Sequence, residues 1–410
     1  MIVRRVRADE IKRCGEVMSL AFEFQNREER SSEEVAKEVT ENPKGRFQRY
    51  YDYKWAAYED DNKTMMGLIS TIPYVVNFDG HTCKMNGIGG VSTLPHYRRT
   101  GSIRGCFEKS LPWMYEEGFA FSYLYPFSSE FYRKFGYELC GEQIAYEVNL
   151  QAYKRFPIGG RVALAEGDDY FEDIKKVYND FARGMNMMCV REDDDYPWAK
   201  ELNPAKDCLY TYVYYNDAGE AKGVMTFEKT RENGAFYAKM NCRQFLFSDM
   251  EGFKGLMNHA LGFIAYYSHI CFRLPVHMDA LGAIAEWPKL PYARTIAHVG
   301  MNRVVNVQMV LEMAKYKGSG KVCMKITDEQ IEQNNGLFTV EFKDSKLIAV
   351  EKGGEAADIE LTIQDFSRLI TGSHDLSQAA WLFGTKILNP ENEALNGVFY
   401  RKPIFIIDSF

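Results

Sequence analysis

The sequence predicts an α+β fold, because segments that alternate like β-strands are interleaved with segments of helical periodicity. Between Lys54 and Leu94, two apolar runs are joined by Asp79-Gly80, a dipeptide that strongly favours a β-hairpin. The segment after this hairpin has apolar residues at spacings of four, four and three, as expected for one face of a helix: Ile103, Phe107, Leu111 and Met114. The last third of the chain repeats the combination, with four β segments between two helical ones.

The first 150 residues are expected to run strand, helix, meander, loop, helix and strand. Ile2, Val3 and Val6 give the first strand, and residues 120–127 give the last. Gly118 is expected to close the second helix. Pro112 lies inside that helix and should kink it or remove one of its hydrogen bonds.

The remaining chain divides into two further sets of elements. Helical patterns cover residues 171–185 and 250–267, and strands are expected at 209–216, 222–230 and 236–247. Two prolines around Trp287, in residues 285–291, indicate a linker. After it come a helix at 307–316, a β meander with strands at 321–328, 336–344, 346–353 and 358–363, and a helix at 365–372. We therefore predict three domains, with bounds 1–150, 151–295 and 296–410.

Composition narrows the class of protein. The net charge of −7 argues against a general nucleic-acid binder, since phosphate contacts need clustered basic side chains, whereas it suits cationic small molecules. The nine cysteines include no C-x-x-C pair and the seven histidines no metal spacing, so we expect neither a metal site nor a disulfide framework. No apolar run reaches 18 residues and no secretory signal opens the chain, so we expect a cytoplasmic protein without a membrane span.

The sharpest local feature is the segment Val91-Ser92-Thr93-Leu94-Pro95-His96-Tyr97-Arg98-Arg99-Thr100-Gly101-Ser102-Ile103-Arg104. A strand ends, a basic turn follows, and a helix begins at a glycine. Unpaired backbone N–H groups and the helix dipole make such a terminus a pyrophosphate site, and Gly101 allows the close approach of phosphates. Arg98, Arg99 and Arg104 add positive charge. The same pattern also fits a solvated basic turn before an ordinary helix.

Three segments together resemble a known family. The turn is similar to motif A of the GCN5-related N-acetyltransferases, R-x-x-G-x-G/A, with Ile103 in place of the small third residue. Its R-R-x-G-x-x-R form resembles the enhanced intracellular survival (Eis) subgroup more closely. The segment Phe131-Tyr132-Arg133-Lys134-Phe135-Gly136-Tyr137 resembles that subgroup's F-Y-x-x-F-G-Y element, and the apolar end IFIIDSF resembles its C-terminus. The resemblance implies two acetyltransferase-like mixed α/β domains followed by a domain similar to sterol carrier proteins.

The resemblance also assigns roles in acetyl transfer. A base must take the proton of the attacking amine, and an acid can protonate the departing thiolate of coenzyme A. By resemblance, Tyr132 is the acid and the α-carboxylate of Phe410 is the base. Without the motif, Tyr132 reads as one packed aromatic residue among 26 tyrosines. An ordinary α-carboxylate has a pKa of about 3.5, so its action as a base requires burial or a bridging water.

Acetyl-CoA is the cofactor that this resemblance implies, as a co-substrate and without a metal. Val91, Ser92 and Thr93 would present the backbone of a splayed strand to the pantetheine arm, and Phe127 and Ser128 correspond to the loop beside it. The expected second substrate is a cationic primary amine, such as an aminoglycoside, a polyamine or a lysine side chain. The family's acidic residue before the chain end is replaced by Ser409, with Asp408 one step earlier, which leaves the choice of amine open.

Two further expectations depend on the same resemblance. Members of the family form hexamers, so we expect a homo-oligomer. The run Glu192-Asp193-Asp194-Asp195 is either an attractor for cationic substrates or a solvated loop. The alternative function is a protein that binds a lipid, another apolar ligand or a partner on an acetyltransferase scaffold that has lost its activity.

Overall fold

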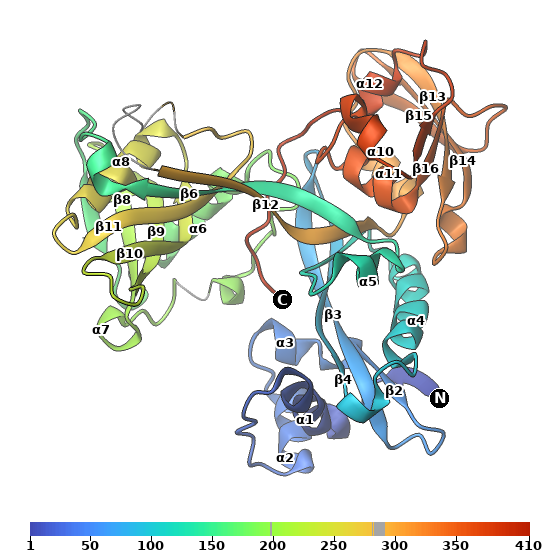
Figure 1. Cartoon of the computed structure of the whole chain (residues 1–410), viewed down its shortest axis with the longest axis horizontal. Helices are drawn as coiled ribbons and strands as arrows, with labels where there is room; N and C mark the ends of the chain where they lie inside the picture. The colour runs from blue at the N-terminus through green and yellow to red at the C-terminus, as the bar shows by residue number, and fades with distance from the viewer. Residues whose placement is uncertain (197–198, 281, 283–291) are drawn as a thin grey trace. The chain divides into compact units, whose positions relative to one another are not determined.

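The computed structural model describes residues 1–196, 199–280, 282 and 292–410, and it divides the chain into two compact units. The first contains Met1–Gly141, Asn186–Val190 and Val299–Phe410, and the second contains Glu142–Met185 and Arg191–His298. The chain passes between the units within β6 (Glu138–Asn149) and within β12 (Tyr292–Val304), and twice more on either side of Asn186–Val190 (Figure 1). The linker expected around Trp287 lies outside the described residues, and the domain bounds near 150 and 295 remain predictions.

A sheet of β1, β2, β3, β4, β5 and the end of β12, paired in that order, forms the frame of the first unit. Only the β4–β5 pair is parallel. The expected hairpin is confirmed, because β3 and β4 are joined at Asp79 and Gly80, whose φ angles of 49° and 92° suit a tight turn. The strands are β1 (Ile2–Arg5), β2 (Lys54–Tyr58), β3 (Met65–Phe78), β4 (His81–Thr93) and β5 (Phe121–Leu124).

Helices cover both faces of this sheet. Adjacent residues of β2 face opposite ways, so Ala56 packs in one cluster with α1 and Ala57 in another with α4 (Figure 1). Helix α4 continues through Pro112, which removes one backbone donor without ending the helix, and the chain turns at Gly118 (φ 73°). The helices are α1 (Ile11–Phe22), α2 (Ser32–Glu41), α3 (Gly45–Arg49), α4 (Ser102–Glu116) and α5 (Ser129–Arg133).

The C-terminal part of the first unit adds a five-stranded sheet in the order β15-β14-β13-β16-β17. The expected meander is wrong at one point: β16 pairs in parallel with β13, because residues 353–358 carry the chain from β15 to the other side of β13. The elements are α10 (Val307–Met313), β13 (Gly320–Thr327), β14 (Gly336–Lys343), β15 (Lys346–Lys352), β16 (Ile359–Thr362), α11 (Ile363–Ile370), β17 (Thr385–Ile387) and α12 (Leu395–Val398).

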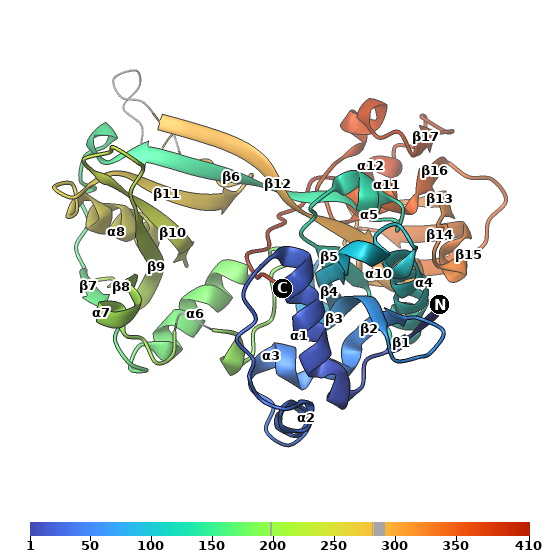
Figure 2. The ribbon, with the colours of Figure 1, turned by 60° about the horizontal axis from the view of Figure 1, so that its bottom comes forward.

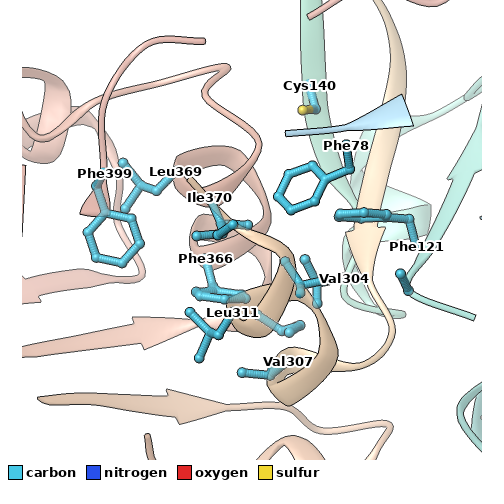
Figure 3. Packing of buried hydrophobic residues seen from close by; sticks show 14 of the residues in the cluster. Phe78, Phe121, Cys140, Val304, Val307, Leu311, Phe366, Leu369, Ile370 and Phe399 are labelled. Atoms are coloured by element: carbon cyan, nitrogen blue, oxygen red, sulfur yellow. The ribbon is translucent and has the colours of Figure 1, made fainter. Parts of the chain in front are cut away.

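One hydrophobic core joins this C-terminal part to the N-terminal sheet. Phe78 and Phe121 of the N-terminal sheet belong to the same buried cluster as Phe366, Leu369 and Phe399 (Figure 3). Their rings and side chains are at most 1% exposed. Because apolar contacts run without a break between the two sheets, the two parts stabilise one another.

In the second unit the strands are paired in the order β6-β11-β10-β9-β8-β7, and α6 and α8 pack against them (Figure 2). Its elements are β7 (Arg161–Leu164), α6 (Phe171–Ala182), α7 (Pro204–Asp207), β8 (Leu209–Tyr215), β9 (Ala221–Thr230), β10 (Ala238–Phe247), α8 (Met250–Leu261) and β11 (Tyr267–Pro275). Mixed sheets with helices on them in both units confirm the expected α+β class. None of the described helices is long and apolar enough to cross a membrane.

Candidate active site

A cleft of about 820 Å³ opens in the first unit where β4 ends and α4 begins. Small-molecule sites typically enclose about 300–1,000 Å³. Its walls include eleven of the residues that the sequence singled out: Val91, Ser92, Thr93, Arg98, Arg99, Thr100, Gly101, Ser102, Ile103, Arg104 and Phe127. The structure therefore gathers the strand end, the basic turn and the loop before α5 around one space.

The strand end has an unpaired edge that faces away from β3. β4 pairs with β3 as far as Thr93, but it pairs with β5 only from Met85 to Ile88. A β-bulge near Gly90, whose φ is 57°, bends the strand at this point. Beyond Ile88, no strand among the described residues pairs with the β5-facing edge of β4, which is the splayed arrangement that the family resemblance implies. The backbone groups of such an edge can hydrogen-bond the amides of an extended ligand.

Helix α4 begins at the cleft and presents its N-terminal turn to it. Gly101, the residue before the helix, has φ 90°, which a residue with a side chain adopts only at a cost. A methyl group added at Gly101 would meet no atom within 4 Å, so the space beside its backbone is open. The first N–H groups of an α-helix have no partner within the helix. Glycine thus provides both the turn and the room that an approaching phosphate needs.

Three guanidinium groups surround this helix start. Arg98, Arg99 and Arg104 are exposed, and none forms an ion pair within the described part of the chain. Their charge is therefore available to an anionic ligand. Arg99 has φ 67°, in the left-handed region, so the turn is tightened at two positions rather than at Gly101 alone.

The short helix α5 brings the remaining motif residues to the opposite wall. Ser128 caps this helix, since its side chain accepts a hydrogen bond from the backbone N–H of Phe131. Tyr132 is 2% exposed and packs edge to face against Phe127, with ring centroids 5.3 Å apart. Neither Ser128 nor Tyr132 is among the residues that line the cleft, so Tyr132 lies behind the cleft wall formed by Phe127.

The environment of Tyr132 keeps its hydroxyl protonated. Burial is the main cause that raises the pKa of Tyr132 above its ordinary value, and nearby Tyr137 raises it further. The hydroxyl group has no hydrogen-bond partner among the described residues. It can therefore donate to a group that reaches it from outside.

The last residue of the chain is seated on β4 rather than frayed. The Phe410 ring lies against Tyr74 and Tyr125, with centroid distances of 5.1 and 5.3 Å. A methyl group added at Gly87 would lie 2.7 Å from the Phe410 ring, and one at Gly89 would lie 2.9 Å from the carboxylate carbon of Phe410. The two glycines thus form a flat seat for the terminal residue. Gly89 is two residues from Val91 in the cleft wall, about 7 Å along the strand.

A buried ion pair fixes the start of this tail, residues 402–410. Lys402 Nζ contacts Asp79 Oδ2 at 2.5 Å, and both side chains are at most 5% exposed. Asp79 also accepts hydrogen bonds from the side chain of Asn186 and the backbone N–H of Lys315. Burial lowers the pKa of Lys402, while Asp79 opposes this shift. Because an unpaired buried charge is costly, the pair holds the tail at this point.

Beyond the ion pair, the tail is held by backbone bonds and apolar burial. Asn186 exchanges backbone hydrogen bonds with Pro403 and Phe405, and Tyr125 donates a hydrogen bond from its hydroxyl to the carbonyl of Asp408. Ile404 and Ile406 are buried in the core shared by the two sheets. Figure 1 shows the tail running from the C-terminal sheet to β3 and β4.

Several residues of the site escaped sequence reasoning. Ala21 and Phe22 also line the cleft, and Asp79, Gly87, Gly89, Asn186 and Lys402 seat or hold the tail. Phe131, Lys134 and Phe135 of the F-Y-x-x-F-G-Y element line the cleft too, although the sequence assigned them no role there. The run Gly87-Ile88-Gly89-Gly90 inside a strand carried a usable signal, since glycine in a strand marks a bulge or a close approach of another backbone.

The acidic run belongs to the second unit, where it forms a short exposed turn, Asp193–Asp195. Asp193 contacts Lys175 at 2.6 Å, and Asp194 contacts Lys200 at 3.8 Å. Part of its charge is therefore matched within the unit. In the described residues, no three His, Cys, Asp or Glu side chains come together in a way that could hold a metal ion.

Both ends of the chain match known protein families. Residues 2–140 match the acetyltransferase (GNAT) domain, and residues 307–399 match the sterol carrier protein domain. The N-terminal part of the chain is therefore an acetyltransferase (GNAT) domain. Domains of the GNAT family use acetyl-CoA, and the expected C-terminal sterol carrier protein domain is confirmed. None of the curated proteins compared with the chain matches it in sequence.

Solved structures share the fold over the whole length. A protein of unknown function from Enterococcus faecalis, described as a probable N-acyltransferase, has a TM-score of 0.83 at 21% identity, with 100% of this chain and 99% of that one covered. A GCN5-related N-acetyltransferase from Anabaena variabilis has a TM-score of 0.83 at 18% identity, and Eis1 from Mycobacterium abscessus has a TM-score of 0.79 at 16% identity. Both comparisons cover 100% of this chain and 100% of the other. At these identities the likeness concerns the fold.

Proposed function

We propose that this acetyltransferase is of the Eis type and transfers the acetyl group of acetyl-CoA directly to a primary amine of a cationic substrate. The observation that carries this proposal is the seat of Phe410 on β4. The chain's terminal carboxylate lies on the same strand as the cleft wall, two residues from Val91. In this proposal a ligand bound in the cleft reaches the phosphate-binding turn, the acid and the base at once.

The residues of the cleft suit acetyl-CoA as the donor. In this proposal the pyrophosphate binds the first turn of α4, with Thr100, Gly101, Ser102 and Ile103 supplying backbone N–H groups and Arg98, Arg99 and Arg104 supplying charge. The pantetheine arm hydrogen-bonds the free edge of Val91, Ser92 and Thr93, with Phe127 beside it, while Ser128 supports this loop as the cap of α5. The open space at Gly101 supports this assignment, because a ligand needs room at that point.

In this proposal the Phe410 carboxylate and the Tyr132 hydroxyl carry the chemistry. The amine nitrogen attacks the thioester carbonyl, a C–N bond forms and the C–S bond breaks. The Phe410 carboxylate takes the proton released by the amine, directly or through a water. Tyr132 donates its hydroxyl proton to the departing thiolate, which leaves as free coenzyme A. The raised pKa of Tyr132 keeps this proton in place until the thiolate forms.

The surroundings of the terminal residue support a cationic amine. The rings of Tyr74 and Tyr125 lie against the ring of Phe410, so the terminal residue sits among aromatic side chains, whose faces attract ammonium groups. A negative terminal charge adds to this attraction. By resemblance to the same subgroup, we also propose a cytoplasmic homohexamer, and a monomeric mass across micromolar concentrations would contradict the hexamer.

The function can be tested by measuring coenzyme A release with a panel of cationic amines. We expect release with at least one polyamine, aminoglycoside or lysine peptide, and none with acetylated forms of the same amines. A thermal-shift titration with acetyl-CoA and with free fatty acids and sterols separates the alternative, since a ligand of the folded state raises its stability. Stabilisation by lipids alone, without any by acetyl-CoA, would favour a lipid-binding protein built on this scaffold.

A further inference from the structure

The helix that carries Tyr132 is too short to hold its own end. α5 contains five residues, Ser129–Arg133, and the last carbonyl groups of an α-helix have no partner within the helix. Isolated helices of this length are not stable in water. The chain leaves α5 through a turn at Gly136, whose φ is 81°. The turn itself binds the carbonyl groups of Tyr132 and Arg133 through the N–H groups of Phe135 and Gly136, and donors from outside that reach this end of α5 help to fix the position of Tyr132.

Three consecutive carbonyl groups at this end are bound by side chains from the C-terminal part of the first unit. Gln364 Nε2, in the first turn of α11, donates to the carbonyl of Arg133 at 3.1 Å. Gln330 Nε2, after β13, donates to the carbonyl of Lys134 at 3.1 Å. Arg303 Nη1, in β12, donates to the carbonyl of Phe135 at 2.5 Å.

The third donor, Arg303, is fixed by a buried ion pair with Asp328. Arg303 and Asp328 are fully buried, and the Nη2 atom of Arg303 lies 2.7 Å from Asp328 Oδ1. Asp328 in turn accepts backbone N–H groups from Gln330 and Ile331 and the side chain of Asn334. One network therefore fixes Arg303 and the loop that carries Gln330. A methyl group at Gly136 would lie 1.9 Å from Arg303 Nη1, so the turn after α5 is closed directly over the guanidinium.

A second contact ties the same turn to α11. Glu138, at the start of β6, pairs with Arg133 at 2.7 Å and with Arg368 at 3.0 Å. These three side chains link the end of α5, the start of β6 and α11. Hydrogen bonds and ion pairs thus reach the segment 133–138 from Gln330, Gln364 and Arg368, all within the sterol carrier protein match, and from Arg303, which lies just before it.

We propose that Arg303, Gln330 and Gln364 are positioning residues for acetyl transfer, through which the sterol carrier protein domain holds Tyr132 against the cleft. The inference rests on the proposed role of Tyr132 as the proton donor. It gives the C-terminal domain a second part in the reaction besides the tail that ends in Phe410. The acetyltransferase site is then incomplete without the domain that follows it.

The test uses Gln330 and Gln364, which are partly exposed, since Arg303 is fully buried and its loss would leave Asp328 unpaired. Gln330→Leu and Gln364→Leu together remove two donors to α5 from side chains at the surface. We expect kcat to fall about tenfold, because small displacements of a reacting group are costly, while the Kd of acetyl-CoA stays within about twofold. Gln308→Leu is the matched control: it removes a donor to the carbonyl of Val350, far in sequence from α5.

The decisive measurement repeats the double change in a Tyr132→Phe background. If the glutamines act through the Tyr132 hydroxyl, they should lower kcat in the wild type but not further in Tyr132→Phe. An equal loss in both backgrounds would mean a general structural role and would overturn the inference. The inference would also be overturned if the double variant kept full activity while Tyr132→Phe was slow. The proposed function would stand in that case. A fast Tyr132→Phe enzyme would remove the acid role itself.

Discussion

The turn at residues 97–104 and the tail at residues 402–410 meet at the same strand, but they are built in opposite ways. The turn is contained in eight consecutive residues, and its features are local: a helix start, a glycine with φ 90° and exposed arginines. The tail depends on partners far away in the sequence, with Asp79 and Asn186 at its start and Tyr74, Gly87 and Gly89 at its end.

This difference teaches how each part can fail. A local turn tolerates change elsewhere, and its loss should weaken binding in proportion to the charges or N–H groups removed. The tail acts as one anchored strap, from the buried Lys402–Asp79 pair to Phe410, so that a change at either end moves the terminal carboxylate. Changes in the tail should therefore affect kcat, whereas changes in the turn should affect the affinity for acetyl-CoA.

The largest expected effect comes from extending the chain. Adding Gly-Ser after Phe410 turns the terminal carboxylate into a neutral amide and pushes the new terminus off its seat on Gly87 and Gly89. Because even a 1 Å misplacement can cost roughly a hundredfold in rate, we expect kcat to fall at least about a hundredfold. The same dipeptide placed before Met1 is the control. Full turnover in the extended protein would remove Phe410 from the mechanism.

A smaller effect is expected from adding a methyl group to β4 beneath the terminal residue. In Gly89→Ala, the new methyl group would lie 2.9 Å from the carboxylate carbon of Phe410, which has little freedom to retreat. We expect kcat to fall about tenfold with an unchanged Kd for acetyl-CoA. Gly15→Ala, whose methyl group would meet its nearest atom at 3.9 Å, should leave both constants unchanged. A Gly89→Ala enzyme of normal kcat would show that the terminal carboxylate is not held by this seat.

Local sequence signals predicted much of the fold. The Asp79-Gly80 hairpin and the helix that carries Ile103 and Phe107 depend on periodicity and turn chemistry within a few residues. The pairing of β16 with β13 was missed, because register between distant strands is set by tertiary contacts and a meander is the simpler order. The core that joins Phe78 to Phe366 likewise leaves no trace in any one segment.

The candidate site divides in the same way. The turn at 97–104 and the strand end at 91–93 could be found because the geometry that makes them a binding site is local. The apolar chain end suggested docking, but its place on β4 required the structure. The bonds from Gln330 and Gln364 to α5 span about 200 residues of sequence, and single polar side chains with such partners carry no pattern.

A smaller effect again is expected from a substitution in the phosphate-binding turn. Gly101→Asn keeps a residue that tolerates a positive φ but adds a side chain to the open space of the cleft. We expect the Kd of acetyl-CoA to rise about tenfold with little loss of stability. The added side chain should displace the phosphate from a backbone N–H group, and a hydrogen bond to a charged group is worth about 1.5–3 kcal/mol. Gly318→Asn is matched in φ (74°) and in open space and lies outside the cleft lining. Equal affinities in the two variants would make the turn an ordinary loop.

The smallest effect is expected from the arginines, and its signature is a dependence on salt. Arg98→Gln with Arg99→Gln removes two exposed charges at the cleft while keeping polar side chains of similar length. Exposed charges attract the phosphates of coenzyme A over a Debye length of about 10 Å at 0.1 M salt and about 3 Å at 1 M. We therefore expect the variant's Kd to be several-fold higher at 0.05 M salt, with the difference shrinking toward none at 1 M.

The control for this last comparison must match the change in net charge. Lys343→Gln with Lys346→Gln removes two exposed charges from the β14–β15 hairpin, away from the residues that line the cleft. If the long-range field of the whole protein set the affinity, both pairs would weaken binding alike. A larger effect at Arg98 and Arg99 assigns the attraction to the turn. An effect at Arg98 and Arg99 that is independent of salt would instead mean that these side chains shape the turn, so that its glycine and backbone alone bind the phosphates.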